Sequence, residues 1–166
     1  MFVFVRYILT NCIVVIDNYE EIKLFDQVVD GNYNVGIRIA SEEEPKFEFY
    51  TSRLGIGYKN IVPFYHSEIK NNPKVTLKML HFFINTGIRD TAYYWNELLK
   101  CMKVYVQLKK ECPSLDSLNI GGGFPIKNSL AFEYDYSYMV SEIIGQIKQV
   151  CNENNIDVPN IFTEFG

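Results

Sequence analysis

Short β-branched or aromatic runs alternate along this chain with segments of helical periodicity, and this alternation is the strongest constraint on its fold. Parallel strands need crossover connections of about a dozen residues, most often helices. The pattern therefore predicts an α/β fold with a parallel sheet and outer helices. An open doubly wound sheet and part of a (β/α)8 barrel both fit it. The five expected strands are Cys12–Ile16, Val35–Ala40, Val75–Ile84, Ser117–Ile120 and Asn160–Glu164.

The connecting segments differ in how clearly they predict helices. The clearest helix spans Thr91–Glu111. Another begins after Asn18 and ends before Gly31. We expect a loop at Ser41–Tyr58 and a weaker helix at Ile61–Lys70. The apolar face of the clearest helix is predicted to consist of Trp95, Leu98, Leu99, Met102 and Tyr105.

Charge and cysteine content argue against several functional classes. The formal net charge is −4, whereas nucleic-acid-binding surfaces need clustered Lys and Arg. The four cysteines form no CxxC pair and only two histidines accompany them, so we expect free thiols in a reducing cytoplasm and no metal site. Residues 1–16 are too short and too polar for a membrane span, and they lack the basic segment followed by a clean apolar run that is typical of a signal peptide. We therefore expect a cytoplasmic protein that binds neither nucleic acid nor membrane.

Three consecutive glycines, Gly121, Gly122 and Gly123, directly follow the fourth expected strand. Glycine tolerates positive φ, and its backbone N–H group can approach an anion closely. The motif GGGFP matches neither GxGxxG nor GxxxxGK[ST], which weakens a dinucleotide or P-loop interpretation. The residues alone leave two interpretations open, a phosphate site and a tight strand-to-helix turn.

Four other polar residues lie at or near the ends of expected strands. Glu164 ends the last strand, at the edge where barrels carry their chemistry, and Arg38 interrupts an apolar strand. His81 lies within a third apolar strand and Thr86 in the turn after it. Each also has a structural interpretation: a strand-end carboxylate, an ion pair, a satisfied core histidine and a turn residue. No GxSxG elbow indicates a hydrolase.

Several ordered segments resemble the fold-type III decarboxylases, which use pyridoxal phosphate and act on ornithine, diaminopimelate or arginine. NIGGGFP and TEFG resemble that family's phosphate loop and pyridine-nitrogen segment. MLHFFINTG resembles its LHFHxGS segment, and GIRIASEEEPKFEFYTSRLGIG resembles a strand with its following turn. The resemblance runs from about Ile13 to Gly166 and is strongest to bacterial arginine decarboxylases.

The resemblance implies a cofactor, pyridoxal 5′-phosphate, and roles for individual residues. Gly121–Gly123 would wrap its phosphate, and Glu164 would bond the pyridine nitrogen and keep it protonated. The parent activity would convert arginine to agmatine and CO2 in polyamine biosynthesis, within a homodimer or higher oligomer. The further residues that the resemblance places at the cofactor are Gly166, Thr86, Phe83 and Arg38.

The chain departs from the family pattern at three positions. Phe83 stands where most members have the histidine that stacks on the ring, so a π face survives there but a proton donor does not. Asn119 replaces the usual aspartate before the glycines, and Phe165 replaces a proline.

The resemblance further implies a partial barrel, about strands four to eight, at residues 13–166, preceded by residues 1–12, which match poorly. No lysine lies in a motif that matches the family's Schiff-base lysine, and the C-terminal β domain is not represented. We therefore expect no catalytic residue and an inactive fragment. The alternatives are a non-catalytic protein that binds the cofactor, a racemase or small cofactor-carrier barrel, and a sugar-phosphate barrel enzyme.

Overall fold

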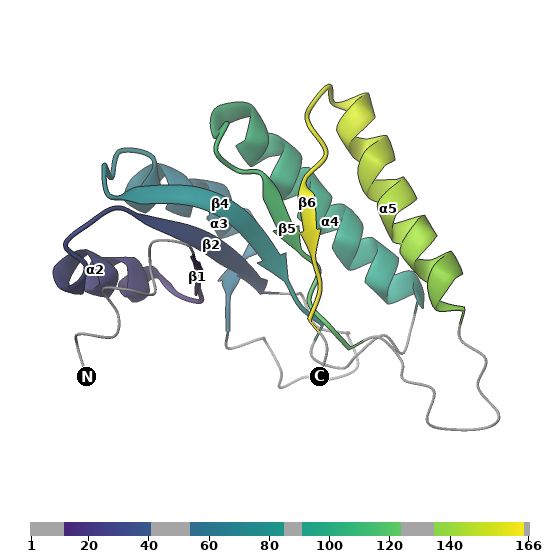
Figure 1. Ribbon diagram of the computed structural model, residues 1–166, viewed down its shortest axis with the longest axis horizontal. Coiled ribbons are helices and arrows are strands. Elements are labelled where there is room, and N and C mark those ends of the chain that lie inside the picture. The colour runs from purple at the N-terminus through teal and green to yellow at the C-terminus, as the bar shows by residue number, and fades with distance from the viewer. Residues whose placement is uncertain (1–11, 41–53, 85–90, 124–134, 165–166) are drawn as a thin grey trace.

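The computed structural model describes residues 12–40, 54–84, 91–123 and 135–164. Within these ranges the strands form one parallel sheet, with α4 and α5 packed alongside its later strands (Figure 1). The strands are β1 (Ile13–Ile16), β2 (Tyr33–Ala40), β3 (Ile56–Gly57), β4 (Val75–Phe82), β5 (Ser117–Asn119) and β6 (Asn160–Phe162).

The order of the strands distinguishes a barrel from a doubly wound sheet. The main path is β1-β2-β4-β5-β6, and β3 pairs with β2 off this path. Each new strand on this path adds to the same edge, and every pairing is parallel. A doubly wound sheet instead reverses its strand order at a switch point. The predicted α/β class is confirmed, and the one-directional order is that of a partial (β/α)8 barrel.

Four helices and one π-helical turn connect the described strands. Asn18 caps the first helix, because its side chain accepts hydrogen bonds from the backbone N–H groups of Glu20 and Glu21. None of the described helices is long and apolar enough to cross a membrane. The helices are α2 (Tyr19–Val28), α3 (Tyr58–Phe64), α4 (Thr91–Glu111) and α5 (Tyr136–Glu153), and the π-helical turn is η1 (Tyr65–Ile69).

Two local predictions were wrong. The expected loop at Ser41–Tyr58 contains β3 and the first residue of α3, and the helix predicted from Ile61 begins three residues earlier. Pro63 lies inside α3, and its missing N–H group weakens the sequence signal for a helix there.

The predicted apolar face of α4 was also partly wrong. Leu99 is 41% exposed, whereas Leu98 is buried. Consecutive residues of a helix point about 100° apart, and here Leu98 rather than Leu99 lies on the buried side. Tyr94, four residues before Leu98, and Cys101, three residues after it, instead complete the buried stripe.

A β-bulge in β4 determines which side chains face away from the helices. Val35 pairs with Leu77, but the next residue of β2, Gly36, pairs with Met79, so Lys78 is skipped. Beyond this shift His81 pairs with Arg38, and it shares the face of the sheet that lies opposite the helices. We call this face the inner face. In a strand without the bulge, alternation would turn His81 towards the helices.

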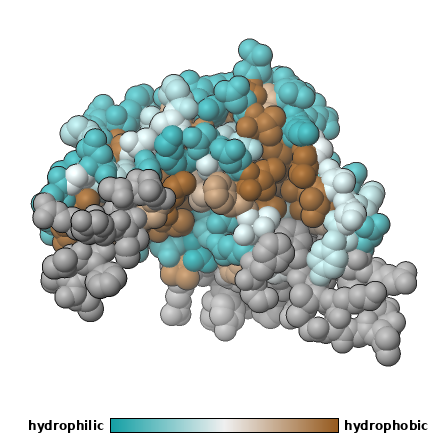
Figure 2. All heavy atoms as spheres, viewed as in Figure 1, coloured by the Kyte–Doolittle hydropathy of each residue, from teal (hydrophilic) through white to brown (hydrophobic). Residues whose placement is uncertain are grey.

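The inner face is partly apolar and tightly packed. A Cβ atom on Gly36 would lie 3.2 Å from Cβ of Met79 and 3.4 Å from Cγ2 of Val15. Phe162, which pairs with Asn119 on this face, keeps 44% of its surface exposed. Figure 2 shows hydrophobic surface over the strands, with hydrophilic surface around it.

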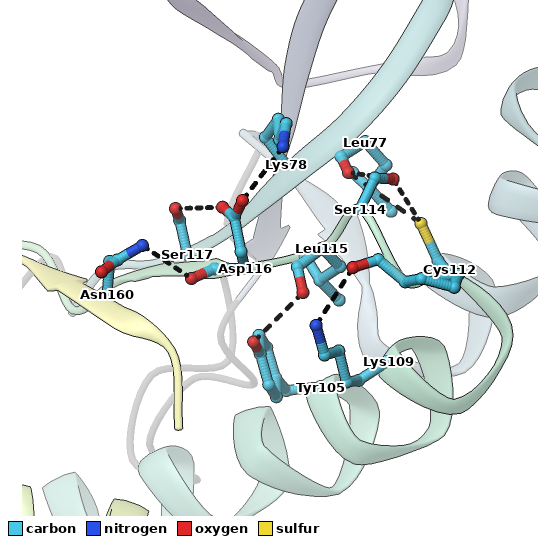
Figure 3. A network of polar contacts seen from close by, with 11 residues as sticks. Leu77, Lys78, Tyr105, Lys109, Cys112, Ser114, Leu115, Asp116, Ser117 and Asn160 are labelled. Carbon is cyan, nitrogen blue, oxygen red and sulfur yellow. Dashed lines mark hydrogen bonds and ion pairs between the residues drawn. The ribbon is translucent and has the colours of Figure 1, made fainter. Parts of the chain in front are cut away.

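A polar network fixes the amino-terminal ends of β5 and β6 (Figure 3). Asp116 accepts hydrogen bonds from Nζ of Lys78 at 3.0 Å and from Oγ of Ser117 at 2.7 Å. Its backbone carbonyl accepts from Nδ2 of Asn160 at 3.3 Å. These bonds tie three neighbouring strands together at the end of β5 opposite the glycines.

A fully buried carboxylate joins α3 to α4. Glu97 Oε2 accepts a hydrogen bond from the Tyr58 hydroxyl at 2.9 Å, and its Oε1 lies 2.9 Å from Nζ of Lys100. A buried charge is tolerated only when it is paired and hydrogen-bonded, and both conditions hold here. The two helices are therefore coupled through this side chain.

We predict that Glu97→Ala lowers the free energy of unfolding by about 2–3 kcal/mol, because it removes the buried partner of Tyr58 and Lys100. Urea denaturation measures the change. The control is Glu153→Ala, at an exposed position at the end of α5, which should change stability by less than about 0.5 kcal/mol. Equal effects of the two substitutions would contradict the assigned role of Glu97.

Candidate functional site

Polar side chains of the inner face gather at the carboxyl ends of the described strands. Asp17 directly follows β1, Arg38 lies near the end of β2, and His81 lies near the end of β4. Asn119 ends β5, and Glu164 follows β6 by two residues. Parallel barrels carry their reactive groups at this edge, so the cluster is the candidate functional site.

The glycine turn packs too closely against its neighbours to accept side chains. Gly121 has φ of 67°, and a Cβ atom there would lie 2.9 Å from the carbonyl oxygen of Phe82. A Cβ atom on Gly122 would lie 2.5 Å from the carbonyl oxygen of Glu164. Gly123 also has positive φ, 79°. The turn therefore fits between the ends of β4 and β6 only because these residues are glycines.

Glu164 is attached to this turn by its backbone and by its side chain. Its N–H group donates to the carbonyl oxygen of Gly121 at 2.9 Å. Its Oε1 accepts from Nδ2 of the buried Asn119 at 2.9 Å, and Oδ1 of Asn119 accepts from the N–H group of Gly121 at 2.8 Å. The glycine turn and the carboxylate thus form one hydrogen-bonded unit.

His81 lies next to the same carboxylate oxygen. It is 7% exposed, and its Nε2 lies 3.5 Å from Oε1 of Glu164. In the described part of the chain neither ring nitrogen has a hydrogen-bond partner, so the expected satisfied core histidine is buried but not satisfied. Burial lowers the pKa of His81 and Arg38 adds to this effect, while Glu164 and Asp17 oppose it. The imidazole is therefore neutral at neutral pH.

Arg38 spans the site between β1 and β4. Its Nη1 lies 3.6 Å from Oδ1 of Asp17, which is the kind of structural ion pair that the sequence suggested. Its guanidinium carbon also lies 5.4 Å from the centroid of the Phe83 ring, within the range of a cation–π contact. The structure therefore brings Arg38 and Phe83 together near the end of β4.

Some predicted site residues cannot be placed, and three others were missed. Thr86 and Gly166 lie outside the described residues. Asp17 was not singled out from the sequence, Asn119 was named only as a departure from the family pattern, and His81 was interpreted as a core histidine. Asp17 and Asn119 directly follow or end strands, which is a signal that could have found them. His81 depends on the bulge, which no sequence signal marked.

The described residues hold no metal cluster, and the described strands carry no lysine at this edge. The described residues contain no group of three His, Cys, Asp or Glu side chains that could hold a metal ion. The one lysine within the described strands is Lys78, and it is bonded to Asp116 at the other end of the sheet.

We predict that the chain loses stability between pH 7.5 and 5.5 through His81. The folded-state pKa of His81 lies below the unfolded value of about 6.5, so the unfolded state binds more protons as the pH falls. The stabilising contribution is complete above the unfolded pKa and is lost below it.

The measurement is urea denaturation of the wild type and of His81→Asn at both pH values. The variant should show a smaller acid-induced loss. His66→Asn, which removes an exposed histidine, should retain the wild-type loss. An unchanged pH dependence in His81→Asn would refute the assignment.

Comparison with known proteins identifies the family. The model described as "Pyridoxal-dependent decarboxylase, pyridoxal binding domain" matches residues 4–166. A biosynthetic arginine decarboxylase of Pelobacter propionicus is 32% identical over 98 residues, which cover 55% of this chain and 15% of that protein. Another, from Prochlorococcus marinus (strain MIT 9215), is 26% identical over 171 residues, which cover 94% of this chain and 26% of that protein. The chain thus spans about a quarter or less of these relatives.

Solved structures support the same fold. The biosynthetic arginine decarboxylase of Campylobacter jejuni superposes with a TM-score of 0.69 at 19% identity, over 92% of this chain and 26% of that one. The diaminopimelate decarboxylase of M. jannaschii superposes with a TM-score of 0.73 at 20% identity, over 90% of this chain and 36% of that one. With most of the chain matched by the family model, this protein belongs to the pyridoxal-binding-domain family of the pyridoxal-dependent decarboxylases, and its cofactor is pyridoxal 5′-phosphate.

Proposed function

We propose that this chain forms the cofactor-binding part of an amino-acid decarboxylase that converts arginine to agmatine and CO2. One observation carries the proposal: the glycine turn and Glu164 are hydrogen-bonded to each other at the carboxyl edge of the sheet. Arginine is proposed as the substrate because the relatives described above are arginine decarboxylases.

The residues at the site fit the two ends of the cofactor. Gly121 and Gly123 have positive φ, a conformation in which backbone N–H groups can converge on an anion, and the turn has no room for side chains. The side chain of Glu164 is 52% exposed. Its Oε2 has no hydrogen-bond partner among the described residues and is available to a ring nitrogen.

The bound cofactor supplies an electron sink for the carbanion that remains when CO2 leaves. The N–H group of Gly121 already donates to Asn119, so the remaining N–H groups of the glycine turn would bind the phosphate, and Oε2 of Glu164 would hold a proton on the ring nitrogen. Neutral His81 adds no positive charge beside Glu164. Phe83 offers an apolar face that excludes water and transfers no proton.

We propose that the Schiff-base lysine and the residues that select the substrate lie outside the described residues. The described strands carry no lysine near Glu164, so we propose that these residues dock the cofactor without turnover. The parent enzyme is proposed to be cytoplasmic and to assemble as a homodimer or higher oligomer. The family and relatives are decarboxylases, which gives the non-catalytic alternative no support.

We predict that Gly122→Ala weakens binding of pyridoxine 5′-phosphate at least tenfold. This probe has the ring and phosphate of the cofactor but no aldehyde, so it cannot react with surface lysines. The added methyl group would collide with the backbone of Glu164 and displace the turn. Calorimetric or fluorescence titration measures the affinity.

The matched control for this substitution is Gly145→Ala. A Cβ atom at this exposed glycine of α5 meets nothing within 4 Å, so the affinity should not change. The proposal fails if the two variants bind the probe equally well.

A second prediction concerns turnover. Purified chain supplied with pyridoxal 5′-phosphate and arginine should release CO2 no faster than the free cofactor does, because the described site lacks an amine. Ornithine, lysine and diaminopimelate serve as comparison substrates. Release well above that background, with the cofactor bound covalently to a single lysine, would show that the chain is catalytically complete.

A further inference from the structure

We propose that Asn119 is a positioning residue: it holds Oε1 of Glu164 against the glycine turn and thereby directs Oε2 at the ring nitrogen of the bound cofactor. The inference deepens the proposed function and rests on it. It assigns different tasks to the two oxygens of one carboxylate, and it makes one side chain responsible for the spacing between the phosphate and ring ends of the site.

The geometry of Asn119 supports this role. The side chain is buried, and both of its polar atoms are used: Oδ1 accepts from the N–H group of Gly121, and Nδ2 donates to Oε1 of Glu164. Glu164 itself is half exposed and has a flexible side chain. A carboxylate in this situation would sample several rotamers unless a fixed donor held it. Asn119 supplies such a donor from the end of β5.

His81 lies beside the same carboxylate oxygen, on the neighbouring strand. It pairs with Asn119 across β4 and β5, and its Nε2 lies 3.5 Å from the same oxygen, Oε1. Among the described residues no donor reaches Oε2. The protein therefore surrounds one oxygen of Glu164 and leaves the other open.

An amide is required because the residue must accept and donate simultaneously. An ionised aspartate, the residue that the family resemblance places here, would still accept from Gly121 but could not donate to Glu164. It would also place a second negative charge beside the first carboxylate. The bridge between the turn and Oε1 is therefore a property of this chain's asparagine.

The experiment compares two probes that separate the ends of the site. Inorganic phosphate reports on the glycine turn alone, and pyridoxine 5′-phosphate reports on the turn and the ring together. The dissociation constant for inorganic phosphate divided by that for pyridoxine 5′-phosphate measures the contribution of the ring to binding. We expect Asn119→Asp to reduce this ratio about fivefold, which is the effect of losing one hydrogen bond. The added negative charge near the turn weakens both probes alike and therefore cancels in the ratio.

A double-mutant cycle tests whether Asn119 acts through Glu164. Glu164→Ala should reduce the ratio to a similar extent, and the double variant should show no further loss, because the two residues contribute one interaction. Ser117→Ala, on the inner face two residues before Asn119, should leave the ratio unchanged. A merely structural role of Asn119 would instead lower both affinities together and add to the effect of Glu164→Ala.

Hydrogen exchange in the unliganded chain tests the other half of the bridge. The N–H group of Gly121 should exchange faster in Asn119→Ala and at the wild-type rate in Asn119→Asp, which keeps the acceptor. Equal protection in both variants would show that Asn119 does not hold the turn and would overturn the inference.

The proposed function and this inference can fail separately. If wild-type protein binds pyridoxine 5′-phosphate no better than inorganic phosphate, the proposed ring site is wrong. If wild-type protein prefers the ring-bearing probe and Asn119→Asp retains the full preference, the proposed function stands and the positioning role of Asn119 is wrong.

Discussion

The skipped pairing at Lys78 determines the composition of the inner face. Before it, Leu77 pairs with Val35; after it, Met79 pairs with Gly36, so one extra residue of β4 is accommodated. The shift reverses the alternation of β4 from that point onward. Leu80 and Phe82 consequently join the core against the helices, and His81 joins the polar cluster at the carboxyl edge. Without this register shift, the side chain of β4 next to Glu164 would be apolar.

The two ends of the sheet perform different tasks. At the amino-terminal end, Asp116 has donors for both carboxylate oxygens and ties β4, β5 and β6 together. At the carboxyl end, both ring nitrogens of the buried His81 lack a hydrogen-bond partner among the described residues, and Oδ1 of Asp17 has only the 3.6 Å ion pair with Arg38. Buried polar atoms without hydrogen bonds are costly, so the unsatisfied histidine at this edge is typical of a functional site rather than of a structural network.

Much of the fold could be predicted from local sequence. The bounds of α4 match the prediction at both ends, because a long amphipathic repeat is a strong signal. The strands were found with ends wrong by one or two residues. β3 was missed because two residues carry no periodicity, and α3 was misplaced because Pro63 obscures it.

The site was only partly accessible from sequence. Gly121–Gly123 were singled out by their place after an expected strand and Glu164 by its place at the end of one, and the structure shows how they bond to each other. The contribution of His81 depends on a register shift that is settled by pairing between strands, which local sequence does not specify. Asn119 was noted as a departure from the family pattern, but its two hydrogen bonds become visible only when β5 and β6 lie side by side.

The central claim is that the carboxyl edge of this sheet binds the phosphate and ring of the cofactor as one site. The most direct test is to map amide chemical shifts by NMR while pyridoxine 5′-phosphate is added. We predict saturable shifts at Gly121, Gly122, Gly123 and Glu164, with no shifts at Lys78, Asp116 and Ser117 at the opposite end. Shifts concentrated at that opposite end, or no saturable shifts at the glycines, would contradict it.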